Sequence, residues 1–108
     1  MEVAKKLQPD ECCNMDDIRR EIDLLDQAVI KILGMRFKYV LAASKFKTSE
    51  TSVRAPERFK AMLAKRREWA EVEGLSPDAI EKLYSDLVNH FIEEEMNRWK
   101  AHQNEGEQ

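Results

Sequence analysis

Three cationic residues and one acidic residue stand where a helical repeat places apolar side chains. Arg19, Arg36 and Lys47 fall on one stripe of residues 16–47 when the chain is counted in steps of three and four, and Glu95 falls on a similar stripe further along. A guanidinium binds a planar carboxylate through two parallel hydrogen bonds, whereas an ammonium is a compact charge suited to one oxygen. The three cations therefore favour a binding site for a small anion, which Glu95 could also face.

A charge on an apolar stripe also has explanations that need no ligand. Each cation could reach the rim of the core, or pair with a carboxylate of the protein such as Asp26, because an isolated charge away from water is costly. Glu95 could pair with Arg98 or lie at a partly solvated edge. For any one cation alone a protein partner is the better explanation, and the presence of three on one stripe favours a ligand.

The spacing of the cations places a limit on how they can meet. In one straight helix, Arg19 and Arg36 are separated by roughly 25 Å, and Arg36 and Lys47 by roughly 16 Å, so one small anion cannot contact all three. If two copies of the helix cross antiparallel near Val29 and Ile30, Arg19 of one chain comes level with the segment from Arg36 to Lys47 of the other. A two-fold axis would then produce two equivalent basic pockets, each built from both chains.

The elements that must position these residues are predicted to be helices throughout. Proline at the start of the second helix, and serine followed by proline at the start of the third, are typical first-turn residues, and Gly74 suits a left-handed helix end. No run of alternating polarity predicts a strand. We expect an all-α chain of three helices with a long first helix, over residues 16–47, 56–73 and 76–102. The polar residues 48–53 are expected to form a loop, either a lid or a simple connector.

The length and charge of the chain favour one domain that works with a second copy. The 108 residues are expected to form a flexible N-terminal arm over residues 1–14, a helical domain over 15–102 and a frayed tail over 103–108. A first helix of about 32 residues would be about 48 Å long, whereas a monomer of this size has a radius of gyration near 13 Å. A partner chain is therefore expected to cover the part of the helix that its own chain leaves exposed.

Composition argues against several classes of function. The net charge of −3 provides no basic field that would recruit nucleic acid, and no long apolar run predicts a membrane span or a signal peptide, so a cytoplasmic location is expected. Cys12 and Cys13 are adjacent and are expected to be free thiols. There is no glycine-rich phosphate loop, nucleophile elbow or metal-ligand cluster, and no cofactor or metal is expected. An enzyme with this sequence would act by binding and electrostatic stabilisation.

Several short motifs together resemble those of the small all-α chorismate mutases. They are D-I-R-R-E-I-D-L-L-D at residues 17–26, A-A-S-K-F-K ending at Lys47, and A-P-E-R at residues 55–58. The segment M-L-A-K-R-R-E-W-A-E-V-E-G-L at residues 62–75, together with Trp99, makes the isochorismate-pyruvate lyases of that family the closer likeness. The resemblance implies an intertwined homodimer of three-helix chains, with two sites shared between the chains.

The resemblance also implies roles for the charged residues. Arg36, and Arg19 reaching in from the partner chain, match the arginines that hold the two carboxylates of the substrate. Lys47 matches the lysine that contacts a carboxylate and the ether oxygen of the breaking C–O bond. The implied reaction cleaves isochorismate, a small dianion, into salicylate and pyruvate by direct hydrogen transfer, with side activity as a chorismate mutase. Salicylate of this origin could serve siderophore synthesis.

Two departures from the family pattern bear on the activity. Glu95 stands where the lyases and many mutases have a glutamine that donates to the ether oxygen, so Glu95 must be protonated to act as that donor. Phe59 stands where many mutases have a glutamate that holds the ring hydroxyl of the substrate, which favours the lyase. Two alternatives stay open: a dedicated chorismate mutase that makes prephenate, and a non-catalytic helical dimerisation module whose cations pair with Glu21, Asp23 and Asp26.

Overall fold

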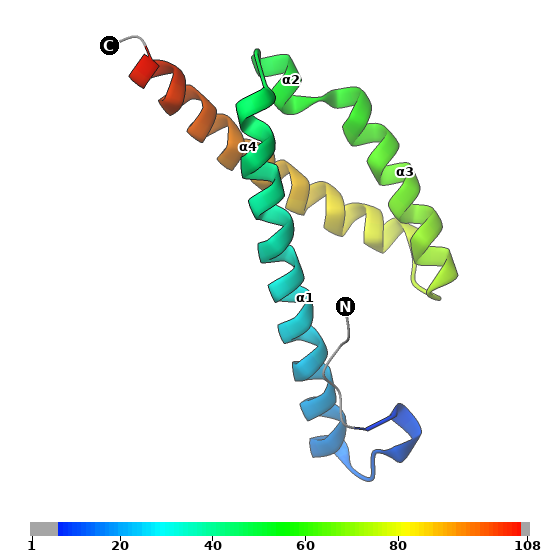
Figure 1. Ribbon diagram of the computed structural model, residues 1–108. Coiled ribbons are helices and arrows are strands. Elements are labelled where there is room, and N and C mark those ends of the chain that lie inside the picture. Colours follow the sequence, from blue (N-terminus) through cyan, green and yellow to red (C-terminus); the bar gives the residue numbers. More distant parts are fainter. Residues whose placement is uncertain (1–6, 107–108) are drawn as a thin grey trace. The chain divides into compact units, whose positions relative to one another are not determined.

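All regular elements in the part of the chain that the structure describes are helical. The structure, a computed structural model, describes residues 7–106 (Figure 1). The helices in this range confirm the all-α class. The elements in order are η1 (Pro9–Glu11), α1 (Met15–Ala43), η2 (Ser44–Phe46), α2 (Glu50–Arg54), α3 (Pro56–Val72) and α4 (Pro77–Gly106). The chain divides into two compact units, Met1–Tyr39 and Val40–Gln108. None of the helices within residues 7–106 combines the length and the apolar composition needed to cross a membrane.

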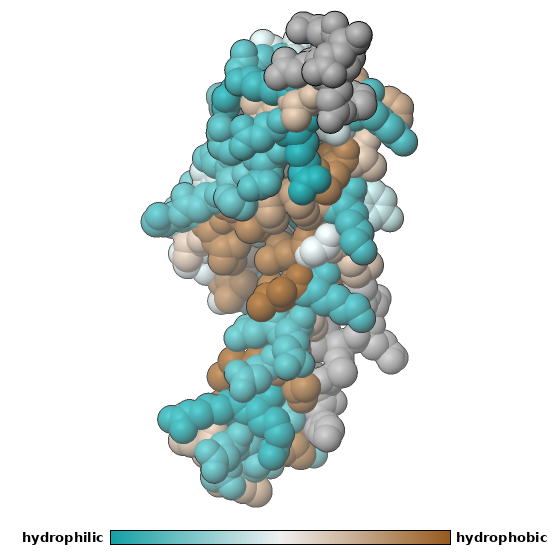
Figure 2. Space-filling view, turned by 90° about the vertical axis from the view of Figure 1, so that its left-hand side faces the viewer, coloured by the Kyte–Doolittle hydropathy of each residue, from teal (hydrophilic) through white to brown (hydrophobic). Residues whose placement is uncertain are grey.

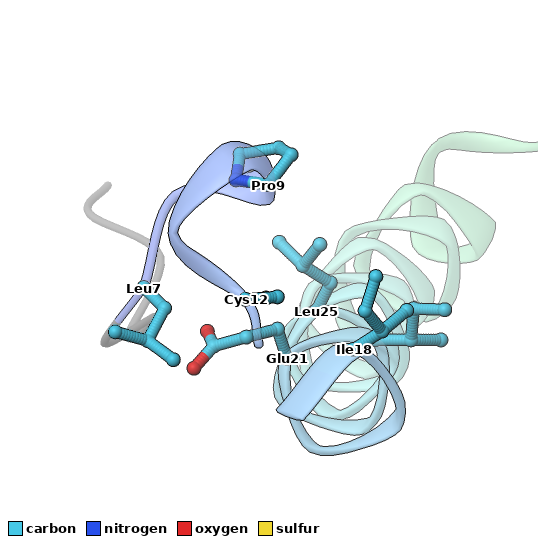
Figure 3. Close-up of a pocket in the computed structure, with 7 residues that line it drawn as sticks. Leu7, Pro9, Cys12, Ile18, Glu21 and Leu25 are labelled. Carbon is cyan, nitrogen blue, oxygen red and sulfur yellow. The ribbon is translucent and has the colours of Figure 1, made fainter. Parts of the chain in front are cut away.

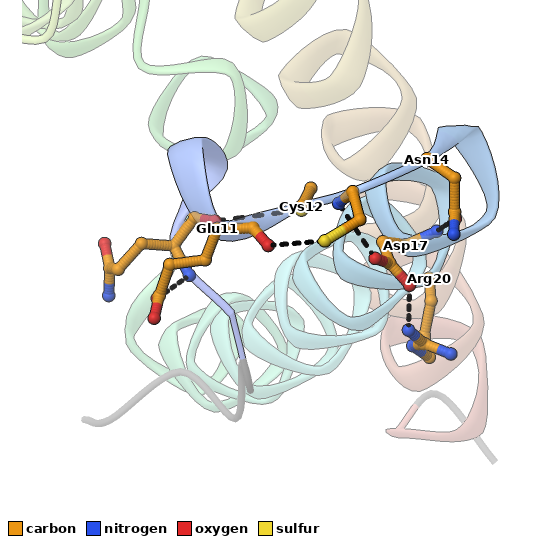
Figure 4. Close-up of polar contacts among 7 residues, drawn as sticks. Glu11, Cys12, Asn14, Asp17 and Arg20 are labelled. Carbon is orange, nitrogen blue, oxygen red and sulfur yellow. Dashed lines mark hydrogen bonds and ion pairs between the residues drawn. The ribbon is translucent and has the colours of Figure 1, made fainter.

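The first unit is built around the start of α1. The side-chain oxygen of Asn14 accepts a hydrogen bond from the backbone N–H of Asp17 at 2.8 Å, so Asn14 caps the helix as its position predicts. The Asp17 carboxylate accepts the backbone N–H of Cys13 at 3.0 Å and pairs with Arg20 at 2.6 Å (Figure 4). These contacts fix the direction in which the preceding residues enter α1.

The preceding residues pack back onto the first turns of α1. Leu7, Pro9 and Cys12 face Ile18 and Leu25 across a hollow of about 180 Å³ (Figure 3). Part of the expected flexible arm is therefore folded, since η1 also forms within it. Residues 1–6 of that arm and residues 107–108 of the expected tail lie outside the described residues, and the proposed division into arm, domain and tail stays a prediction.

Along most of its length, α1 presents a row of apolar side chains to solvent. Val29 is 52% exposed, although it stands in the middle of the apolar stripe of the helix. Figure 2 shows apolar side chains on the molecular surface among hydrophilic ones. The large exposed residues of this helix, which we call the α1 apolar row, are Met15, Ile18, Ile22, Leu25, Val29, Ile30, Ile32, Met35 and Tyr39. The row has the spacing of a helix that packs against another helix.

The second unit contains an antiparallel pair, α3 and α4, joined by a tight turn. Gly74 has a positive φ of 75°, and the N–H of Leu75 bonds the carbonyl of Ala70 at 2.8 Å, a left-handed helix end. Ser76 accepts the N–H of Ala79 at 3.2 Å and so caps α4. The sequence predicted both ends correctly, because glycine, serine and proline act locally.

The core of the second unit is small and lies between α2, α3 and α4. Among the described residues its buried apolar side chains are Val53, Met62, Ala70 and Met96, contributed by all three helices. Arg67 of α3 adds ion pairs to Asp78 at 2.8 Å and Glu81 at 3.2 Å on α4. The packing orients the face of α4 that carries Met96 and the adjacent Glu95 toward the interior.

The structure corrects the expected course of residues 44–55. The first long helix ends at Ala43, not at Lys47, and the Ser44 hydroxyl donates to the carbonyl of Leu41 at 2.6 Å, where the helix tightens into η2. Most of the expected loop belongs to α2, because Ser49 caps a new helix instead of only breaking the old one. At the other end of the chain, α4 continues to Gly106, four residues beyond the expected end.

Candidate active site

Lys47 lies just past the end of η2, where the backbone becomes extended. Its own N–H bonds the carbonyl of Ser44 at 3.1 Å, and its φ and ψ are −88° and 133°. The ammonium Nζ donates to the backbone carbonyl oxygen of Ser52 at 2.9 Å. The side chain is half-buried, so the ammonium is held in place and partly shielded from water.

Trp99 of α4 fixes the backbone of Lys47. Its indole Nε1 donates to the carbonyl oxygen of Lys47 at 3.2 Å, a contact between residues 52 positions apart. Trp99 lies four residues after Glu95, so the two side chains share one face of α4. The contact therefore brings the chain at Lys47 to the face of α4 that carries the acid.

Glu95 is an acid buried inside the second unit. It is only 4% exposed, and within the described residues its Oε1 atom has no hydrogen-bond partner. Burial raises the pKa of Glu95 above its ordinary value, and the positive charge of Lys47 opposes that shift without cancelling it. The carboxyl group of Glu95 thus keeps its proton to higher pH than a glutamate in water, and a protonated carboxyl can donate a hydrogen bond.

A hollow of about 280 Å³ lies next to Trp99. It is lined by Leu41, Ser44, Lys45, Arg98 and Trp99, so two further cations border it and Trp99 connects it to Lys47. The lining combines an aromatic and an aliphatic surface with positive charge. Such a lining suits an organic anion better than an apolar ligand.

Arg19 and Arg36 lie in the first unit, on α1. Arg19 is exposed and Arg36 is half-buried. Among the described residues, neither guanidinium is paired with a carboxylate. The salt bridges to Glu21, Asp23 and Asp26 that a non-catalytic module would use are therefore not formed by these two arginines within the described chain. The structure brings Lys47 and Glu95 together, and the shared site of all four residues stays a prediction.

Comparisons with known proteins identify the family. The sequence model of the family described as chorismate mutase type II matches residues 18–96, close to three quarters of the chain. This chain belongs to that family. The match spans Arg19, Arg36, Lys47 and Glu95, so all four predicted site residues lie within the family domain.

Relatives of this chorismate mutase type II chain divide into two kinds. A protein of Pseudomonas aeruginosa named isochorismate pyruvate lyase is 41% identical over 92 residues, which cover 85% of this chain and 91% of that protein. A T-protein of Haemophilus influenzae is 38% identical over 81 residues, and one of Enterobacter agglomerans is 37% identical over 82 residues. The aligned parts are 74% and 75% of this chain but only 20% and 22% of the two T-proteins.

Two contacts of this family member were not anticipated from its sequence. The sequence indicated Trp99 only as part of the family resemblance, and Ser52 only as part of a loop. A buried indole N–H needs an acceptor, which was a signal that Trp99 would bond something, although not that it would bond Lys47. The contact of Ser52 depends on its backbone carbonyl, which every residue has, so no residue type could reveal it.

The chemistry available at the pair is the donation of hydrogen bonds. The ammonium of Lys47 and a protonated Glu95 are two donors, and one of the three N–H bonds of the ammonium is already directed at Ser52. Two donors in a water-poor site stabilise an oxygen on which negative charge develops during a reaction. The pair is thus suited to stabilising such an oxygen of a ligand.

We predict that Glu95→Gln increases the free energy of unfolding by an amount that grows as the pH rises from the ordinary pKa of a glutamate to the raised pKa of folded Glu95. The pKa of Glu95 is raised in the folded chain, so as pH rises the unfolded chain loses this proton first, and the parent loses stability until the pH passes the folded pKa. A glutamine has no proton to lose. Urea unfolding at several pH values measures the difference.

Glu71→Gln makes the same chemical change at an exposed position of α3 and is the matched control. It is expected to keep the pH dependence of the parent. If the free energies of unfolding of Glu95→Gln and the parent differed by the same amount at all pH values, the prediction would be contradicted.

Proposed function

We propose that this protein is an isochorismate-pyruvate lyase, which cleaves isochorismate into salicylate and pyruvate. The observation that carries the proposal is the pair of donors, Lys47 and buried Glu95, in a chain that aligns over 91% of a relative named for this reaction. The reaction needs a flexible substrate held in one conformer and an ether oxygen stabilised as its bond breaks. The site supplies groups for both tasks.

The proposed reaction moves one hydrogen and breaks one bond. The C–O bond between the ring and the enolpyruvyl group breaks, and a ring hydrogen passes to the methylene carbon of that group. The ether oxygen leaves with the side chain and becomes the keto oxygen of pyruvate, while the ring becomes aromatic as salicylate. Lys47 and protonated Glu95 donate to this oxygen as it gains negative charge, so they stabilise the transition state more than the bound substrate.

The two carboxylates of the substrate are assigned to the arginines. We propose that Arg36 binds one carboxylate and that Arg19 of a partner chain binds the other. This assignment is supported by the type of group, because a guanidinium forms paired hydrogen bonds to a carboxylate, and by the lack of protein carboxylates paired with either arginine among the described residues. Arg19 and Arg36 are also separated by roughly 25 Å along one helix, so the two arginines that bind one small substrate must come from two chains.

A homodimer follows from the same helix. The 29 residues of α1 form a rod about 44 Å long, and the α1 apolar row is exposed along it. Contiguous apolar surface of this kind is typical of an interface between subunits. We propose that α1 of a second chain covers the row and that two shared sites result. A cytoplasmic location and the use of salicylate in siderophore synthesis remain predictions.

A chorismate mutase activity is the second candidate. The family model favours it, because the matched family is named for that reaction. Phe59, half-buried on α3, offers no polar group to the ring hydroxyl of chorismate. We therefore propose mutase chemistry as a slower side reaction of the lyase.

The experiment that decides between the two reactions uses the purified chain with each substrate alone. Isochorismate is expected to give salicylate and pyruvate in equal amounts, followed by the fluorescence of salicylate and by a pyruvate assay. Chorismate is expected to give prephenate at a lower kcat/KM. Faster formation of prephenate would favour the dedicated mutase, and absence of both products would favour the non-catalytic module.

We predict that Lys47→Ala lowers kcat on isochorismate by about 10²–10³-fold, the usual effect of removing one donor to a developing negative charge. The oligomeric state is expected to be unchanged, because Lys47 is outside the α1 apolar row. The matched control is Lys82→Ala, which removes an exposed lysine whose ion pair to Asp86 lies elsewhere on α4. Parent-like turnover by Lys47→Ala would contradict the proposed role.

We predict that kcat of the parent falls as the pH rises through the folded pKa of Glu95, because loss of the proton converts a donor into an acceptor. The shift of that pKa above its ordinary value moves the loss of activity to higher pH. Glu95→Gln keeps a donor at all pH values, so its profile should stay level over the range in which the parent declines. Identical pH profiles for the two proteins would show that Glu95 is not the donor.

We predict that Val29→Asp shifts the protein from dimer toward monomer, because a charge would be buried in the centre of the α1 apolar row. Turnover should fall at the same time, since each site takes Arg19 from the other chain. Val72→Asp places the same charge at an exposed valine of α3 and should leave the dimer intact. Sedimentation equilibrium measures the oligomeric state of both variants and of the parent. A monomeric parent would refute the shared site.

A further inference from the structure

The hydroxyl of Ser52 organises the short segment between Lys47 and α2. It accepts the backbone N–H of Thr48 at 3.2 Å and that of Ser49 at 3.1 Å, and it donates to the carbonyl of Ser49 at 2.8 Å. The Ser49 hydroxyl in turn accepts the N–H of Ser52 at 3.1 Å. The two serines therefore form a reciprocal capping box that closes the chain on itself directly after Lys47.

The backbone carbonyl of Ser52 holds the ammonium of Lys47. Ser52 lies in α2, and the residue four positions later, which would donate to its carbonyl in a continuing helix, is Pro56. Proline has no N–H, so this carbonyl is left without a helical donor. The Nζ atom of Lys47 donates to it at 2.9 Å. The proline at the start of α3 thus leaves open the acceptor that Lys47 uses.

This segment is also attached to the helix that carries the acid. Arg54 of α2 pairs with Glu93 at 3.2 Å, and Glu50 of α2 lies 3.7 Å from Lys100, with both partners on α4. These pairs are exposed and each contributes little stability. The half-buried Ser52 has several short contacts, so it is the stronger restraint.

We propose that Ser52 is a positioning residue for Lys47: its hydroxyl fixes the turn of residues 47–52, and its carbonyl directs the ammonium. One N–H of the ammonium is used in this way and two remain for a ligand. A lysine side chain is otherwise flexible, so a restraint of this kind keeps the charge near the reacting oxygen. The catalytic consequence rests on the proposed lyase function, whereas the restraint itself can be measured without turnover.

The kinetic test compares three serine variants. Ser52→Ala is expected to lower kcat about 10-fold with little change in KM, because a misplaced ammonium weakens transition-state stabilisation more than binding. Ser52→Thr keeps a hydroxyl and should restore most of the rate. Ser76→Ala, which removes the cap of α4 far from Lys47 in sequence, is the matched control for lost helix capping and should turn over like the parent.

A double variant separates positioning from a general loss of stability. In the Lys47→Ala background, Ser52→Ala should cause no further fall in kcat, since the group that Ser52 positions is gone. If Ser52→Ala lowers the rate equally with and without Lys47, or if Ser76→Ala lowers it as much, the role is merely structural and the proposal fails.

A second measurement does not depend on activity. In protein with ¹³C-labelled lysine, the Cε signal of Lys47 is assigned as the one missing from Lys47→Ala. It is expected to be rigid in the parent, in Ser52→Thr and in Ser76→Ala, and mobile in Ser52→Ala. Equal mobility in the parent and Ser52→Ala would overturn the restraint. A rigid Lys47 in a parent that acts on neither isochorismate nor chorismate would instead reject the proposed function alone.

Discussion

A carboxyl group that cannot reach water, placed near an ammonium, is the constraint on which the candidate site depends. Glu95 is 4% exposed, and the pKa shift shows that burial outweighs the attraction of Lys47. A fully buried ion pair would need hydrogen bonds to both charges, and Oε1 of Glu95 has no partner within the described residues. Burial therefore moves the balance toward a neutral acid beside a charged lysine. This state supplies two donors, whereas an ion pair would direct its donors and acceptors at each other.

The fixed position of Lys47 explains why such a pair can persist. Its backbone carbonyl is held by Trp99 and its ammonium by Ser52, so both ends of the residue are restrained by separate parts of the second unit. The indole contact comes from α4 and the carbonyl contact from α2, and these helices pack together around Val53 and Met96. A small core thus determines the position of a polar site.

The sequence predicted the parts of this arrangement that local signals control. The turn between α3 and α4 was correct because Gly74, Ser76 and Pro77 act through backbone conformation and capping within a few residues. The unusual position of Glu95 was visible from helical spacing. The end of α1 and the existence of α2 were missed because serine both ends and begins helices, and which occurs depends on packing. The contact of Trp99 with Lys47 joins residues 52 positions apart and has no local signal.

The α1 apolar row exposes apolar surface to water, whereas Glu95 places a polar group in the core, and neither arrangement favours the folded state of a single chain. Much of the row remains in water while the second unit buries an acid among few apolar side chains, so a single chain gains little stability from either. A partner covering the row would add apolar burial and, by the arrangement proposed above, bring a guanidinium toward each site. That added positive charge would lower the pKa of Glu95, whereas removal of water would raise it. Because a bound dianion offsets the cations with its own negative charge, occupation of the site would favour the protonated acid. Substrate binding would therefore strengthen the donor that its reaction requires.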